Sequence, residues 1–166
     1  MKRSIIVVAA AMCVSGIAGA ADKEAPVIVS ISRLSMDMAV KLAKASIDAC
    51  RKENVNVAVT VIDRGGHPQV VLRDTLTMDL ALPISKQKAY TAMSFNAPTS
   101  QLEGRFPGSY SVPKLDSLVV AAGGLPITAG GAIVGGIGVS GAPSGVTDEK
   151  CAQAGIDAIK FELETF

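Results

Sequence analysis

The sequence predicts an α+β fold in which an antiparallel sheet, built from two hairpins, is flanked by helices. Two observations indicate the hairpins: glycine pairs at Gly65-Gly66 and Gly130-Gly131 each interrupt a run of strand-like sequence. A third indicates the helices, because apolar residues recur at helical spacing before, between and after these runs. The expected order is α-ββ-α(α)-ββ-α. Strands joined by tight turns are antiparallel, and helices must cover their apolar faces.

The first helix is predicted over residues 36–53. Ser35 is a suitable N-cap, and Asp37 in the first turn complements the helix dipole. Arg51 and Lys52 suit the C-terminal end for the same reason. The face expected to be buried carries Ala39, Leu42, Ala43, Ser46, Ile47 and Cys50.

The first hairpin is predicted from residues 55–62 and 69–73. Valine occupies every second position from 55 to 61, and most intervening residues are small or apolar, which favours a central strand covered on both sides. Arg64, Gly65 and Gly66 are expected to supply positive φ angles at the turn. Pro68 is then tolerated only near the start of the returning strand or at an edge.

The second half is predicted to begin with a helix from Pro83 to about Phe95, followed by a short helix capped by Thr99. Residues 104–116 are rich in Gly, Pro and Ser and are expected to form a long surface loop, a type of segment that is often functional.

The second hairpin is predicted over residues 126–129 and 132–140. A last helix is expected to be capped by Thr147, with Asp148 and Glu149 as first-turn residues. Its buried stripe is expected to contain Ala152, Gly155, Ile156, Ile159 and Leu163.

The first 20 residues have the pattern of a secretory signal peptide. Lys2 and Arg3 precede a short apolar run, and residues 18–20 (AGA) fit the rule for cleavage between small residues. The apolar run is too short for a membrane span. We therefore expect a periplasmic or secreted protein, with a signal peptide over 1–20, a tether over 21–32 and one domain over 33–166.

Charge and motifs exclude several function classes. The formal net charge is +1 with no basic run, which argues against a nucleic-acid partner. Residues 136–141 match G-x-G-x-x-G, but they lie in a predicted hairpin strand too near the end of the sequence for a dinucleotide-binding sheet. The glycines are then expected to let a helix lie close, or to leave a hollow for a ligand. With one histidine in the chain, a hydrolase triad is not expected.

Cys50 and Cys151 are predicted to form a disulfide. Cys50 ends the first helix and Cys151 lies in the first turn of the last one, so the two sulfurs become neighbours if these helices pack antiparallel. Export permits such a bridge. The alternative is a pair of buried free thiols that act as small apolar residues.

Three side chains are candidates for ligand binding, each with a simpler alternative. His67 is either a polar residue after a turn or a ligand of haem iron or another metal. Lys88 either faces a pocket or is solvated. Tyr110 is either a surface residue of the long loop or a movable oxygen ligand.

Five blocks, taken together and in order, resemble the GlcG/HbpS family of haem-binding or haem-degrading domains, which are also found fused to some corrinoid adenosyltransferases. The blocks are VTVIDRGGH (59–67), KAYTA (88–92), GGLPI (123–127), GGIGVSG (135–141) and DEKCA (148–152). The resemblance implies a profilin-like α/β sandwich and homo-oligomers. It also adds Gly123 and Gly124 to His67, Lys88 and Tyr110 as expected ligand-binding residues.

The resulting hypothesis is an exported small-ligand-binding protein for haem, held non-covalently, or a related tetrapyrrole. It would be an accessory to sensing or uptake, with a membrane sensor or transporter as its partner. The alternatives are an accessory factor or enzyme for a small organic acid or aromatic compound, with its pocket near Lys88 and the glycine-rich hairpin, and an oligomeric module without a ligand. Binding is favoured over catalysis, and no haem-degrading turnover is expected, because the sequence shows no acid–base set.

Overall fold

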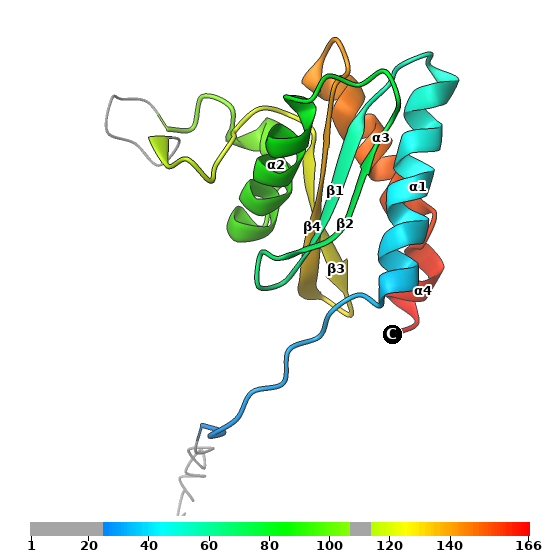
Figure 1. Cartoon of the computed structure of the whole chain (residues 1–166). Helices are drawn as coiled ribbons and strands as arrows, with labels where there is room; N and C mark the ends of the chain where they lie inside the picture. Colours follow the sequence, from blue (N-terminus) through cyan, green and yellow to red (C-terminus); the bar gives the residue numbers. More distant parts are fainter. Residues whose placement is uncertain (1–24, 107–113) are drawn as a thin grey trace, which may run out of the picture. The chain divides into compact units, whose positions relative to one another are not determined.

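The computed structural model describes residues 25–106 and 114–166 (Figure 1). The predicted signal peptide and Tyr110 therefore lie outside the described residues. Residues 25–30 belong to a separate N-terminal unit and contain no helix or strand. All the elements below lie in the second unit, residues 31–166.

The predicted antiparallel α+β fold is confirmed. Two hairpins, β1–β2 and β3–β4, join through β1 and β4 into a four-stranded sheet of order β2-β1-β4-β3 in which every pairing is antiparallel. The elements are α1 (Met36–Lys52), β1 (Ala58–Asp63), β2 (Pro68–Arg73), α2 (Ala81–Phe95), the 3-10 helix η1 (Thr99–Leu102), β3 (Gly124–Ala129), β4 (Ala132–Ser140), α3 (Gly145–Asp157) and α4 (Lys160–Glu164).

The helices cover the sheet on two sides. In Figure 1, α2 lies on one face, and α1, α3 and α4 lie on the other. The main core fills the space between the sheet and α1 and α3. The predicted buried face of α1 is correct at every position, because all six of its residues are buried. Burial of this stripe removes its apolar area from water and fixes α1 against the sheet.

Helix α2 lies unusually close to the sheet because β4 carries glycines there. A Cβ atom at Gly138 would lie only 1.9 Å from the carbonyl oxygen of Ser85, and one at Gly136 would lie 2.5 Å from that of Ala89. Neither position has room for a side chain. The glycine motif of β4 therefore serves close packing of a helix on a strand, as the interpretation against dinucleotide binding required.

Several predicted boundaries were wrong. The last helix begins at Gly145 and is capped by Ser144, whose hydroxyl accepts from the N–H of Thr147 at 3.2 Å. Thr147 was the predicted cap, but Ser144 is the residue with the extended backbone that an N-cap requires. The helix also ends at Asp157, and a separate short helix, α4, follows.

Cys50 and Cys151 are joined by a disulfide, with their Cα atoms 5.5 Å apart. The bond ties the C-terminal end of α1 to the first turns of α3. The two helices lie side by side on the same face of the sheet, so the end of one meets the start of the other (Figure 1).

Candidate functional site

The structure places the predicted site residues at two different ends of the sheet. Strand β1 pairs with β4 from Ala58, opposite Ser140, to Asp63, opposite Gly135. The ammonium of Lys88 donates to the carbonyl of Val139, the residue before Ser140, whereas His67 lies in the turn that follows Asp63. Five steps along a strand cover about 17 Å, so the two side chains do not form one site within a chain. We call these regions the lysine end and the hairpin end.

At the lysine end, Lys88 is buried, with 4% of its surface exposed. Its ammonium donates to Asp148 Oδ2 at 2.8 Å and to the carbonyl oxygen of Val139 at 3.1 Å. The simpler expectation of a solvated lysine was therefore wrong. Lys88 reaches these partners because the glycines of β4 bring α2 close to the strand.

The sequence did not identify Asp148 as the partner of Lys88. It lies in the first turn of α3 as predicted, but it is buried, and its Oδ1 accepts from the N–H of Ala142 at 3.0 Å. Burial raises the pKa of the Asp148 carboxyl, although the hydrogen bond and charge of Lys88 act in the opposite direction. No local signal could have revealed the pair, because 60 residues separate its members in the sequence.

Gly123 and Gly124, two further predicted ligand-binding residues, lie against Lys88 and its helix. Gly123 has φ +124, and a Cβ there would lie 2.7 Å from Lys88 Nζ. A Cβ at Gly124 would lie 2.3 Å from the carbonyl oxygen of Lys88. Both residues therefore make room for Lys88 and for its helix.

A neighbouring carboxylate holds this region together. Glu149, also predicted as a simple first-turn residue, accepts from the hydroxyl of Ser100 at 2.7 Å and from the N–H of Gly123 at 3.2 Å. It thus ties α3 to η1 and to the residue before β3. The segment that carries Gly123 is fixed from two sides, by Lys88 and by Glu149.

A pocket of about 360 Å³ opens over the Lys88–Asp148 pair. Its size is within the range of small-molecule sites. Apolar side chains from the loop before α2, from α2 itself and from residues 119–121 form most of its wall, and the two charged side chains and Ser140 provide polar atoms. The residues that line it are Met78, Leu80, Ala81, Ile84, Lys88, Val119, Ala121, Ser140, Gly141, Ala142, Gly145 and Asp148.

At the hairpin end, His67 is exposed, with 77% of its side-chain surface accessible. It follows the β1–β2 turn, in which Gly66 has φ +86 but neither Arg64 nor Gly65 has the predicted positive φ. Asp63 organises this turn, because its Oδ1 accepts from the N–H of Gly65 at 2.8 Å and from that of His67 at 3.0 Å. His67 is thus a turn residue whose imidazole remains accessible.

The Asp63 carboxylate also lies close to two further side chains, Arg33 and His67. Its Oδ2 lies 3.4 Å from Arg33, and its Oδ1 lies 3.4 Å from Nδ1 of His67. Burial opposes ionisation of this carboxyl, but the two backbone N–H groups, Arg33 and His67 together hold the pKa of Asp63 below its ordinary value. Nδ1 of the imidazole thus lies near a carboxylate, and none of the described residues pairs with Nε2, so Nε2 is open to a ligand.

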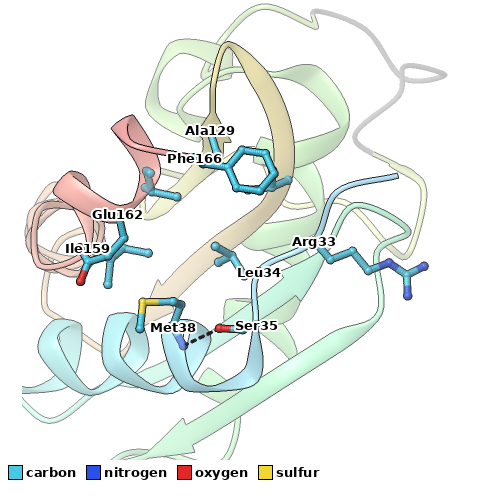
Figure 2. A pocket seen from close by; sticks show the side chains of 10 residues that line it. Arg33, Leu34, Ser35, Met38, Ala129, Ile159, Glu162 and Phe166 are labelled. Carbon is cyan, nitrogen blue, oxygen red and sulfur yellow. Dashed lines mark hydrogen bonds between the residues drawn. The ribbon is translucent and has the colours of Figure 1, made fainter. Parts of the chain in front are cut away.

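A second pocket, of about 260 Å³, lies between the start of α1, the β3–β4 hairpin and the C-terminal residues (Figure 2). Its lining is mainly apolar and includes Leu34, Ile159 and Phe166. Figure 2 shows the guanidinium of Arg33 pointing away from it. Unlike the lysine end, this pocket has no buried charged group among its described lining residues.

A metal-binding cluster and a membrane-spanning helix are both absent from the part of the chain that the structure describes. No cluster of three or more His, Cys, Asp or Glu side chains is arranged to hold a metal ion there. Within the same residues, no helix is long and apolar enough to cross a membrane.

The comparison with protein families decides the family. Residues 34–157 match the model described as haem degrading protein HbpS-like, which covers most of the domain. The chain belongs to the HbpS-like family. The resemblance inferred from the five sequence blocks is thus confirmed.

Individual relatives agree with this assignment. GlcG of Escherichia coli K12 is 34% identical over 112 residues, which cover 64% of this chain and 81% of GlcG. The crystal structure of a double mutant of HbpS from Streptomyces reticuli is 34% identical, with a TM-score of 0.77, and covers 95% of this chain and 99% of that one. A crystal structure of a PduOC–haem complex is 26% identical, with a TM-score of 0.71, and covers 76% and 95%.

Proposed function

We propose that this HbpS-like protein is an exported haem-binding protein that holds haem, or a related tetrapyrrole, non-covalently. The observation that carries the proposal is its similarity to PduOC, a related domain whose crystal structure is a complex with haem. Family membership supports the same ligand class. Fold alone does not determine a ligand, so the residues of this chain must also suit the group.

The hairpin end suits haem by its chemistry. His67 has an exposed imidazole with Nε2 free, the kind of group that binds haem iron axially. Arg33 lies beside it through their shared partner Asp63, and Arg64 precedes the turn glycines. Guanidinium groups pair well with carboxylates such as the haem propionates. When bound, haem would supply redox chemistry and a strong absorption band. His67 would bind its iron, and the two arginines would orient its propionates.

We further propose that the protein forms homo-oligomers and that His67 lies near a contact between subunits. A haem on one exposed imidazole would remain largely in water, and the chain has no second histidine to complete its coordination. A neighbouring subunit can cover the macrocycle. Exposed apolar side chains such as Met36 and Val40 on α1 and Val71 on β2 provide surface for such contacts. Light scattering on the purified protein at tens of micromolar tests this, and a monomer would contradict it.

Export and an accessory role complete the proposal. The signal-like residues 1–20 and the disulfide between Cys50 and Cys151 both suit an oxidising compartment outside the cytoplasm. There the protein would transfer haem to a membrane transporter or signal the presence of haem to a membrane sensor. Cell fractionation of a tagged full-length protein tests export, and recovery of uncleaved protein from the cytoplasm would contradict it.

Haemin titration tests the haem proposal directly. The wild-type protein should shift the Soret band saturably, the variant His67→Ala should lose the shift, and added imidazole should restore it in that variant. Gln153→Ala, at an exposed position on α3, is the matched control and should behave like wild type. A wild-type protein without a Soret shift overturns haem binding.

Two further outcomes of the same titration assign the details. An unchanged Soret shift in His67→Ala makes His67 a turn residue only and makes Tyr110 the next ligand candidate, tested by Tyr110→Phe. We also propose binding without turnover. Loss of the Soret band after a reductant is added in air, at a rate above that of free haemin, would contradict this part of the proposal.

A further inference from the structure

The pocket at the lysine end is separate from the proposed haem site. It lies at the other end of the sheet from His67, and its described lining contains no histidine. A polar floor lies under an apolar wall. The floor is made by Lys88, Asp148 and Ser140, all buried, and the wall by residues that include Leu80, Ile84 and Val119.

The polar floor retains unused hydrogen-bonding capacity. A lysine ammonium has three N–H donors, and Lys88 uses two of them, on Asp148 and on the carbonyl of Val139. The Asp148 carboxylate accepts two hydrogen bonds and has further lone pairs. Among the described residues, the hydroxyl of Ser140 has no hydrogen-bond partner, and it is not fully buried, because the fully buried side-chain atoms without a partner are Gln69 Oε1 and Thr77 Oγ1. The hydroxyl is therefore accessible from the pocket, and a polar ligand atom there could pair with it, with the third N–H of Lys88 or with Asp148.

The charge of the floor selects the ligand. Lys88 and Asp148 are the only charged residues among the described lining residues, and they neutralise each other. A carboxylate ligand would be repelled by Asp148, and an ammonium ligand by Lys88. Either would also lose its hydration without a net opposite charge to compensate it. An uncharged hydroxyl or carbonyl group avoids this cost, because it can accept from Lys88 or Ser140, and a hydroxyl can also donate to Asp148.

From these observations we propose that the pocket over Lys88, Asp148 and Ser140 binds a small uncharged molecule with an apolar, aromatic or branched body and one hydroxyl or carbonyl group. Of the two ligand classes expected near Lys88 from the sequence, this favours the aromatic compound over the organic acid. The site does not depend on haem, and it would be a second ligand-binding site in the same domain.

A series of four ligands with the same benzene ring tests the proposal. The protein used is the one purified after expression of the full-length sequence. Benzyl alcohol, toluene, benzoate and benzylamine are titrated while methyl signals are followed by NMR. Benzyl alcohol should shift the signals of Ala81, Ile84 and Val119 saturably. The two charged ligands should bind at least about tenfold more weakly than benzyl alcohol, because each introduces an uncompensated charge. Toluene should also bind more weakly than benzyl alcohol, since it leaves the floor unpaired.

Variants locate the binding. Ala121 is an exposed lining residue, so Ala121→Phe fills the pocket from its mouth without disturbing the core, and it should abolish the shifts. Ala158→Phe adds the same ring at an exposed alanine beyond the pocket lining and should bind like wild type. Ser140→Ala should reduce the difference in affinity between benzyl alcohol and toluene, because it removes one hydrogen-bonding partner of the ligand hydroxyl. This last variant keeps the test decisive if Ala121→Phe fails to fold.

Several results would overturn the proposal. They are no saturable shift at the pocket methyls, binding of benzoate or benzylamine as tight as that of benzyl alcohol, or equal binding to Ala121→Phe. The failure of the haem proposal is a different result, because the variant His67→Ala should bind benzyl alcohol unchanged and Ala121→Phe should retain the Soret shift of haemin.

Discussion

The two ends of the sheet show opposite solutions to the problem of placing charge. At the hairpin end, Asp63 is satisfied by the backbone of its own turn and by exposed cationic side chains. At the lysine end, Asp148 is satisfied by Lys88, which comes from a different helix and is equally buried. One carboxylate organises local chain geometry, and the other joins two layers of the fold.

This difference indicates which end of the sheet can bind or release a ligand without disturbing the fold. The hairpin end exposes its imidazole to solvent, so His67 is free to acquire or lose a ligand. The lysine end is fixed by an ion pair, by Glu149 on Gly123, and by the disulfide one turn along α3. A ligand there must fit an arrangement that already exists, whereas a ligand at the hairpin end requires a further surface to cover it.

The largest expected effect is that of Lys88→Met, which leaves the Asp148 carboxylate buried without its cation. It should lower the free energy of unfolding at pH 7 by about 3–5 kcal/mol. Burial already raises the pKa of Asp148 above its ordinary 3.8, and loss of Lys88 raises it further. The stability of the variant should therefore fall as pH rises from 3.8 through that raised pKa. Urea unfolding at several pH values measures this.

A double variant is the control for that experiment. Lys88→Met combined with Asp148→Leu replaces both charges by apolar groups, and it should recover most of the lost stability. A double variant as unstable as Lys88→Met would mean that packing around the ammonium, and not the unpaired carboxylate, caused the loss.

The next effect concerns the disulfide that supports the lysine end. Replacing Cys50 and Cys151 together by Ala should cost about 2–5 kcal/mol, since the bond constrains a long loop in the unfolded chain. Thiol counting on the denatured, unreduced protein provides the direct check. Two free thiols per chain would show that the bond does not form in the exported protein, and the double alanine variant should then cost much less.

Asp63→Asn tests the hairpin end and should cost about 1–2 kcal/mol, because the turn loses charge-assisted hydrogen bonds. The pKa of Asp63 is lowered below 3.8, so its contribution is complete above that pH and is lost as pH falls through the lowered value. The difference between wild type and Asp63→Asn should thus shrink only as pH falls below 3.8. The deficit of Lys88→Met should already shrink above pH 3.8, as pH falls through the raised pKa of Asp148. Deficits that shrink over the same pH range would contradict the comparison.

The smallest effect is expected for His67→Ala. An exposed side chain without buried contacts should change the free energy of unfolding by no more than about 0.5 kcal/mol. Thermal unfolding without haemin is the measurement. A large loss would show that the imidazole stabilises the turn and is not held free for a ligand.

Local patterns in the sequence predicted the hairpins, the helices and the buried face of α1 correctly, because periodicity and turn residues act over a few neighbours. The five ordered blocks also identified the family. Start signals were less exact where two polar residues competed, as Ser144 and Thr147 did for the cap of α3.

The partner of Lys88 was decided only by the tertiary structure. Asp148 and Glu149 both appear in the sequence as acidic residues at a helix start, a role that explains them without any distant contact. Their pairing with Lys88 and with Ser100 depends on how closely α2 approaches the sheet and on where α3 begins. Likewise, only the strand register shows that His67 and Lys88, both predicted to bind ligands, lie at opposite ends of the sheet. A sequence records which groups exist, but an ion pair or a pocket depends on distances that only the packed chain determines.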